Sequence, residues 1–193
     1  MARPKELDRD EALQKAIGVF CDKGYAAAST DELMHAMKIS RQSMYDTFGD
    51  KRELFLKALE MYVTDSVSSI NMELEKPGSA LAAVRNALVS FAERKDLSSG
   101  EGCMGMNAIC EFDQRDADVT RIIQKAGRTL RQTLIRVLTR AKSQGELRPD
   151  ADLDRMADFF ESTLAGIRMM AKAGKSRQAL RNIAAFAGKA YME

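Results

Sequence analysis

Residues 24–55 read GYAAASTDELMHAMKISRQSMYDTFGDKRELF, and this stretch decides how the N-terminal part of the chain folds. Ser29, with a glutamate three residues later, forms a capping-box pattern that starts a helix. Ser40 is a second residue of the type preferred at helix N-caps, and Asp50 is a third. The stretch therefore predicts two short helices joined by a tight turn at Lys38–Ile39, followed by a longer helix.

The rest of the chain also favours helices. The sequence is 45% hydrophobic and 30% charged, with only 3 prolines, and no run alternates between apolar and polar residues as a strand would. We expect an all-α fold of about nine helices, with the first ending at Gly24 and a loop-like segment beginning at Leu97. The other expected helices cover, approximately, residues 80–95, 103–112, 119–144, 153–173 and 177–191.

Length and composition limit the class of protein. A chain of 193 residues is long enough for one domain or two small ones. Met1–Glu6 lack the apolar run of a signal peptide, and no stretch approaches the roughly 18 apolar residues of a membrane-spanning helix. The three cysteines form no CxxC pair and are expected to be cytoplasmic thiols. Because the net charge is only +2, any DNA contact must come from a local cluster.

Residues 24–55 resemble the DNA-binding domain of the TetR/AcrR family of transcriptional regulators. The resemblance implies a helix-turn-helix DNA-binding domain over residues 1–52 and a helical ligand-binding and dimerisation domain over residues 53–193. It also implies repression as the default, at a palindromic operator in double-stranded DNA. The residues that carry it are Gly24, Tyr25, Leu33, Ala36, Ile39, Ser40, Tyr45 and Phe48 (a YxxF pattern), Lys51, Leu54 and Phe55.

The predicted recognition helix begins with side chains that suit DNA. Arg41 can donate two hydrogen bonds to guanine, Gln42 can pair with adenine, and Ser43 can reach a base or a phosphate. Tyr45 and Lys51 are expected to contact the backbone. The further candidates are Ser29, Thr30 and Ser40. The alternative is that the serines only cap helices and the tyrosine only packs.

This chain departs from the family pattern at two positions of the predicted interface. The family often has threonine where this chain has Ala28, which removes or moves one phosphate contact. It often has glycine or proline where this chain has Gln42, which is larger and can add a base contact. The family's operator sequences therefore do not carry over to this chain.

Two apolar stripes near the C-terminus are expected to pair with those of a second copy, because the resemblance implies a dimer. The alternative is packing within one chain. The stripes are Leu153, Met156, Phe160, Leu164, Ile167 and Ala171, and Leu180, Ile183, Ala184, Ala187 and Tyr191.

A second motif, GCMGMNAICEF at residues 102–112, resembles one branch of TetR-type regulators. Some members of that branch sense electrophiles, oxidants or metals through this cysteine, which is Cys103 here. A cation lowers the pKa of a nearby thiol and so raises its reactivity, and Lys172 is the candidate cation. The alternative is that Cys103 and Cys110 are small buried residues, as free cysteines usually are.

The resemblance implies a cavity for an unknown small-molecule inducer. We expect no cofactor and no metal. The alternative for its candidate residues is a plain core. The candidates are Phe91, Cys103, Met104, Met106, Asn107, Phe159, Thr163, Met170 and Lys172. An enzyme is disfavoured, because the single histidine, His35, lies in the helix-turn-helix and no catalytic motif is present. The remaining rival is a helical ligand-binding or adaptor protein without DNA binding.

Overall fold

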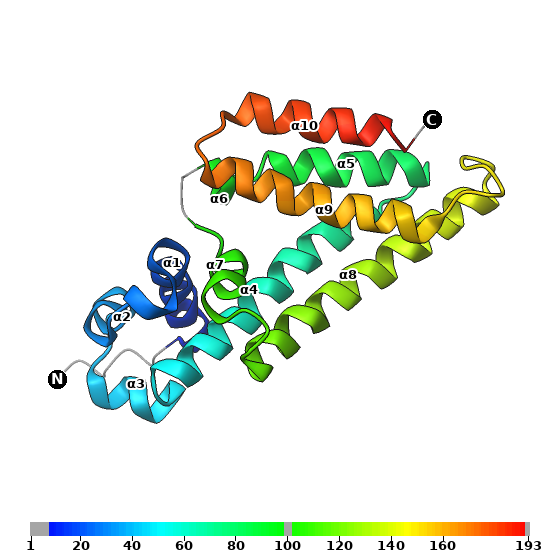
Figure 1. Cartoon of the computed structure of the whole chain (residues 1–193). Helices are drawn as coiled ribbons and strands as arrows, with labels where there is room; N and C mark the ends of the chain where they lie inside the picture. The colour runs from blue at the N-terminus through cyan, green and yellow to red at the C-terminus, as the bar shows by residue number, and fades with distance from the viewer. Residues whose placement is uncertain (1–7, 99–101, 192–193) are drawn as a thin grey trace. The chain divides into compact units, whose positions relative to one another are not determined.

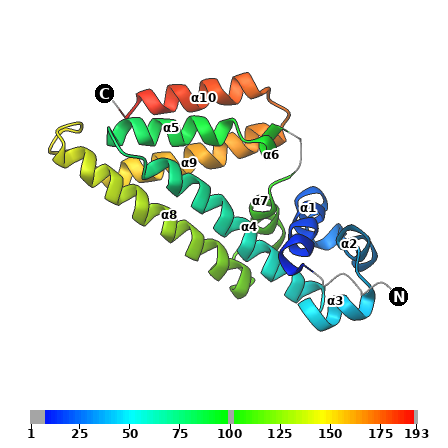
Figure 2. The ribbon, with the colours of Figure 1, turned by 180° about the vertical axis from the view of Figure 1, so that it is seen from behind.

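The computed structural model describes residues 8–98 and 102–191, so Met1–Glu6 lie outside this part of the chain. Within it the fold is all-α, as predicted, and opposite views show the helices in Figures 1 and 2. The prediction missed one four-residue helix, α6, in the segment expected to be loop-like. The helices are α1 (Arg9–Ala27), α2 (Thr30–Met37), α3 (Arg41–Phe48), α4 (Lys51–Leu74), α5 (Ala80–Ala92), α6 (Lys95–Ser98), α7 (Met104–Phe112), α8 (Ala117–Ser143), α9 (Leu153–Lys172) and α10 (Arg177–Lys189).

Short polar side chains start the helices of the N-terminal stretch. The Ser29 hydroxyl accepts a hydrogen bond from the Glu32 amide, and the Glu32 carboxylate accepts one from the Ser29 amide, which completes the predicted capping box. Ser40 and Asp50 each accept a hydrogen bond from the amide three residues later, at 3.1 and 2.9 Å. Each such cap is worth about 1 kcal/mol, so these side chains set the boundaries of α2, α3 and α4.

Helix α1 bends at Gly24. This residue has φ 76° and ψ −173°, outside the helical region and in a conformation that favours glycine. The helix predicted to end at Gly24 therefore continues, after a kink, for three more residues to Ala27.

The chain forms two compact units, each with its own core. The first consists of Met1–Val63 and Gly102–Ile123, and the second of Thr64–Glu101 and Gln124–Glu193. Helix α7 and the start of α8 thus belong with α1, α2 and α3, although they are distant in the sequence. The division into domains at residues 52 and 53 stays a prediction.

The core of the first unit is built on aromatic residues. Phe20, Phe48 and Phe55 are at most 1% exposed, and the rings of Phe20 and Phe55 meet edge to face at 5.1 Å between centroids. Leu33 from α2 and Met44 from α3 complete this core. Met104 and Ala108 of α7 belong to the same core, so the helix-turn-helix and α7 share one core.

In the second unit α5, α9 and α10 pack side by side (Figures 1 and 2). The predicted assignment of the two C-terminal stripes to a dimer interface is wrong for their buried members, which lie in the core of this unit. Leu153 and Met156 are half-buried and Ile183 is exposed, so a dimer contact of these three residues stays a prediction. Periodicity marks an apolar face but does not say which helix covers it. The large apolar side chains that remain exposed on α9 and α10 are Phe159, Met169, Ile183 and Phe186.

Across residues 8–98 and 102–191, no helix is both long enough and apolar enough to cross a membrane.

Candidate nucleic-acid interface

A tight turn joins α2 to α3, as the sequence predicts. Lys38 adopts a left-handed conformation with φ 57°, and its amide donates to the His35 carbonyl at 3.2 Å. The Ile39 amide donates to the Met34 carbonyl at 3.2 Å, and the Ile39 side chain packs against the core of the first unit. These hydrogen bonds and the packing of Ile39 fix the position at which α3 begins.

Helix α3 divides cleanly into a buried and an exposed face. Met44 and Phe48 are fully buried, whereas Arg41, Gln42 and Tyr45 are exposed. Tyr45 is 47% exposed, so the interpretation of this residue as plain core is wrong. The face that carries the predicted DNA contacts is the face that solvent reaches.

Two of the predicted base-reading side chains hold acidic partners that sequence reasoning missed. Arg41 Nη2 lies 2.9 Å from Asp31 Oδ1 on α2, and the Gln42 amide donates to Asp46 Oδ1 at 2.8 Å. The Arg41 and Asp31 side chains are 61% and 80% exposed, and such ion pairs contribute at most about 1 kcal/mol. Asp46 is four residues after Gln42 and was detectable from helical spacing, but no local signal links Asp31 to Arg41.

Two of the three candidate hydroxyl groups at the helix starts, those of Ser29 and Ser40, cap helices. The Ser29 hydroxyl donates to Glu32 at 2.9 Å, and Thr30 is the half-buried first residue of α2. Ser40 Oγ accepts from the amide of Ser43, which leaves its own hydroxyl hydrogen available to a phosphate. Ser40 is therefore better placed than Ser29 to contact DNA.

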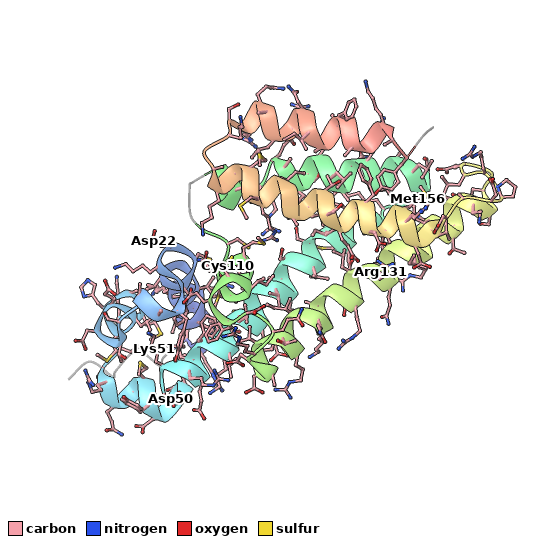
Figure 3. All side chains as sticks on the ribbon, in the orientation of Figure 1. Asp22, Asp50, Lys51, Cys110, Arg131 and Met156 are labelled. Carbon is pink, nitrogen blue, oxygen red and sulfur yellow. The ribbon has the colours of Figure 1, made fainter. Side chains whose placement is uncertain are left out.

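Lys51 begins α4 beside Asp50 (Figure 3). Its Nζ lies 4.5 Å from the centroid of the Tyr25 ring, a cation–π contact. That ring also packs against the rings of Phe55 and Phe112, at 4.9 and 5.2 Å between centroids. The Lys51 ammonium, which is predicted to bind phosphate, therefore lies over an aromatic cluster that includes Phe112 of α7.

The next residue, Arg52, is held by two aspartates at the start of α8. Its guanidinium donates to both oxygens of Asp116 at 2.7 and 3.1 Å, and to Asp118 at 3.2 Å. The hydrogen bond from Arg52 lowers the pKa of Asp116 from 3.8 to about 2. Asp116 also caps α8 by accepting from the amide of Val119. The starts of α4 and α8 are therefore tied together.

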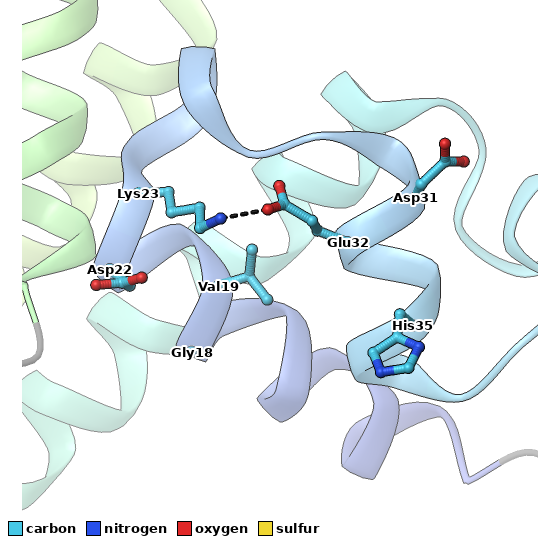
Figure 4. A pocket seen from close by; sticks show the side chains of 7 residues that line it. All are labelled: Gly18, Val19, Asp22, Lys23, Asp31, Glu32 and His35. Atoms are coloured by element: carbon cyan, nitrogen blue, oxygen red, sulfur yellow. Dashed lines mark hydrogen bonds and ion pairs between the residues drawn. The ribbon is translucent and has the colours of Figure 1, made fainter.

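A shallow hollow lies between α1 and α2 in the first unit (Figure 4). Asp22 and Asp31 stand at its two ends, and the Lys23 ammonium bonds Glu32 within it. This bond, with the Ser29 amide, lowers the pKa of Glu32 to about 2. The hollow also includes His35, and its charged groups form a bridge between the two helices.

Two family models match this chain. Residues 12–58 match bacterial regulatory proteins, tetR family, and residues 77–187 match the tetracyclin repressor-like C-terminal domain. The chain belongs to the TetR family. This membership confirms the resemblance seen in residues 24–55, and it confirms the prediction of a DNA-binding regulator and not an enzyme.

Similar proteins cover nearly the whole length of this TetR-family chain. The uncharacterized HTH-type transcriptional regulator YezE of Bacillus subtilis strain 168 is 32% identical over 174 residues, which span 89% of this chain and 90% of YezE. The repressor ComR of Escherichia coli K12 is 28% identical over 186 residues, 94% of this chain and 88% of ComR. A solved structure of a cysteine-substituted CifR, a TetR-family regulator complexed with 26-base-pair double-strand operator DNA, matches with a TM-score of 0.80 and 28% identity, over 98% of this chain and 99% of CifR.

Four of the candidate sensor residues lie on or next to α7 in the first unit. Cys103 is half-buried, and its sulfur accepts from the Met106 amide at 3.5 Å and lies 3.4 Å from the Tyr62 hydroxyl. Met104 is fully buried, and Met106 is half-buried. Asn107 donates to two backbone carbonyls of α1. Met104 and Asn107 thus have structural roles within this unit.

The other five candidates belong to the second unit. Phe91 is 2% exposed, and the guanidinium carbons of Arg94 and Arg168 lie 5.7 and 4.9 Å from its ring centroid. Both arginines also donate to the buried Ser66 hydroxyl, at 3.3 and 2.6 Å. The remaining four side chains lie along α9, where Phe159 and Lys172 are exposed and Thr163 and Met170 are half-buried.

Proposed function

We propose that this TetR-family regulator is a repressor that binds palindromic double-stranded operator DNA as a homodimer and releases it when an inducer binds. The observation that carries the proposal is the exposed first turn of α3, where Arg41 and Gln42 lie beside half-buried Ser43. Repression follows the relative ComR, which is a repressor. A regulator of this kind acts in the cytoplasm, where its DNA is.

The contacts divide into two roles. Arg41, Gln42 and Ser43 read base edges in the major groove, while Tyr45, Lys51 and Ser40 hold the backbone. Arg41 exchanges its ion pair with Asp31 for the DNA contact. Because that pair is exposed, breaking it costs about 1 kcal/mol or less, which a bidentate contact to guanine offsets.

The homodimer forms through the exposed apolar side chains of α9 and α10. Phe186 is 79% exposed, and Phe159, Met169 and Ile183 are each between 39% and 45% exposed. An exposed set of large apolar residues on neighbouring helices marks an interaction surface. Twofold symmetry then presents two copies of α3 to two half-sites.

The inducer acts in the first unit, where Cys103 is the proposed thiol sensor. Its sulfur caps the first turn of α7, so a bulky or charged adduct removes that cap. The test is release of DNA by an alkylating agent from wild type but not from Cys103→Ser. Cys110→Ser, which alters an exposed thiol of the same helix, is the matched control and should still release DNA. Equal release from all three proteins ends the thiol proposal.

The rival function is a helical ligand-binding or adaptor protein without DNA binding. Aspartates near the recognition helix, such as Asp31 and Asp46, favour it because they repel phosphates. Selection of bound sites from random double-stranded DNA distinguishes the two functions. Recovery of a palindrome supports the repressor, and recovery of no sequence supports the rival.

Two variants test the assigned roles on the selected site. Arg41→Ala should weaken binding to the cognate site by roughly 10- to 100-fold while changing non-specific binding little. Lys51→Ala should weaken binding to all sequences and reduce the salt slope by about one. Gel shifts over a salt series measure both effects, and an unaltered slope in Lys51→Ala removes this residue from the phosphate contacts.

A further inference from the structure

The kink at Gly24 interrupts the regular geometry of α1. At the ends of helical segments, carbonyl and amide groups take hydrogen bonds from outside the helix. Such groups need hydrogen bonds from elsewhere in the molecule. In this chain, α7 supplies them.

Asn107 and Glu111 are one helical turn apart on α7 and meet the two sides of the kink. The Asn107 amide donates to the carbonyls of Phe20 and Cys21, at 3.3 and 2.9 Å. The Glu111 carboxylate accepts from the amides of Tyr25 and Ala26, at 2.9 and 2.8 Å. The donor, Asn107, thus faces the carbonyls before Gly24, and the acceptor, Glu111, faces the amides after it.

Two glycines allow α7 to come this close. A Cβ at Gly24 would lie 2.0 Å from Glu111 Oε1, and a Cβ at Gly102 would lie 2.0 Å from the Cys21 carbonyl oxygen. The glycine, asparagine and glutamate of the motif at residues 102–112 therefore share one physical task, which is to hold the kink.

The held kink leads directly to a proposed DNA contact. Glu111 fixes the Tyr25 amide, and the Tyr25 ring carries the Lys51 ammonium at 4.5 Å. Phe112, the residue after Glu111, packs against the Tyr25 ring at 5.2 Å between centroids. Glu111 and Lys51 are thereby linked through a single residue, Tyr25.

We propose that Asn107 and Glu111 are positioning residues for operator binding, which act by holding the α1 kink and the Tyr25 ring beneath Lys51. This inference rests on the proposed function, because Lys51 is assigned there as a backbone contact. Helix α7, which is far from the helix-turn-helix in the sequence, thereby positions Lys51, the proposed contact to the DNA backbone.

The experiment compares Glu111→Ala with Lys51→Ala and with the double variant, in gel shifts over a salt series. Glu111→Ala should weaken operator binding by roughly tenfold and lower the salt slope by about one, as loss of one phosphate contact would. In the Lys51→Ala background the same change should have little further effect, because the two residues act through one contact. Asn107→Ala should act in the same direction.

Glu146→Ala is the matched control. Glu146 also accepts hydrogen bonds from two backbone amides, those of Ala80 and Leu81, but it does so in the second unit. Its substitution should lower the thermal midpoint while leaving operator affinity and salt slope unchanged. If Glu111→Ala does not fold, Glu111→Gln, which keeps one acceptor oxygen, replaces it with a smaller expected loss.

Two results overturn the inference while the proposed function stands. One is a folded Glu111→Ala protein with wild-type affinity and salt slope, and the other is fully additive losses from Glu111→Ala and Lys51→Ala. Failure of wild type to bind any DNA overturns the proposed function and this inference with it. Hydrogen exchange then separates the geometry from the function, because Glu111→Ala should still speed exchange of the Tyr25 and Ala26 amides.

Discussion

At the scale of single residues, aspartates hold two of the exposed side chains of α3, Arg41 and Gln42. Arg41 is the side chain best suited to read guanine, yet in the unbound protein it pairs with Asp31. An exposed pair of this kind is weak, so it orients the arginine without preventing exchange for a stronger partner. We therefore expect the pair to affect operator affinity more than the stability of the fold.

Replacing Asp31 tests this reading of the pair. Asp31→Asn removes a negative charge beside the proposed interface and frees Arg41, so operator affinity should rise by roughly three- to tenfold at low salt. The thermal midpoint should fall slightly, because Asp31 also lies in the first turn of α2, where a carboxylate is favourable. Gel shifts at low and high salt measure the effect.

Asp22→Asn is the charge-matched control, since Asp22 stands at the opposite end of the hollow between α1 and α2 (Figure 4). It should change affinity less than Asp31→Asn. An equal gain from both variants would show that net charge alone is responsible and that the Arg41 pair has no special part.

At the scale of helices, caps set the boundaries and ion pairs hold the ends together. Arg52 at the start of α4 donates to both oxygens of Asp116, which also caps α8. The depressed pKa of Asp116 means that its carboxylate stabilises the folded state wherever it is ionised. This contribution is complete above the unfolded pKa of about 4 and is lost as the pH falls toward 2.

Asp116→Asn isolates this ion pair, because asparagine keeps the ability to cap α8. The free energy of unfolding should fall by about 1 kcal/mol at pH 7. The difference from wild type should shrink as the pH is lowered from 4 to 2, where the wild-type carboxylate takes up its proton. Urea unfolding at a series of pH values measures this, and a difference that is independent of pH would contradict the ion-pair explanation.

At the scale of the whole molecule, the proposal requires two copies. The buried members of the stripes on α9 and α10 are used inside the second unit, so the surface left for a partner consists of the exposed side chains of the same helices, Ile183 among them. Phe186, at 79% exposure, is the most exposed of these large apolar side chains. Burying an aromatic side chain of this size contributes about 2 to 3 kcal/mol to association.

Phe186→Asp should convert the dimer to a monomer at micromolar concentration and weaken operator binding strongly, because two half-sites are no longer held together. Met72→Asp is the control, since Met72 is 64% exposed on α4, away from the α9 and α10 surface in the sequence. Sedimentation velocity measures the oligomeric state. A Phe186→Asp protein that remains dimeric would place the interface elsewhere.

The helices and the helix-turn-helix could be predicted from the sequence alone, because caps, glycines and helical periodicity are local properties of a few neighbouring residues. Ser29, Ser40 and Asp50 start helices in the structure as their types predict. The family followed from the same stretch. These features depend on short-range chemistry within residues 24–55.

Contacts between groups that are distant in the sequence depend on the packing of the helices. This packing joined Arg41 to Asp31, Arg52 to Asp116, and Glu111 to the amides at the α1 kink, and it placed the buried members of the C-terminal stripes in the core. The physical reason is that an apolar face or a charged side chain fits many partners equally well. The packing of whole helices around two cores selects one partner among them, and no local pattern carries that choice.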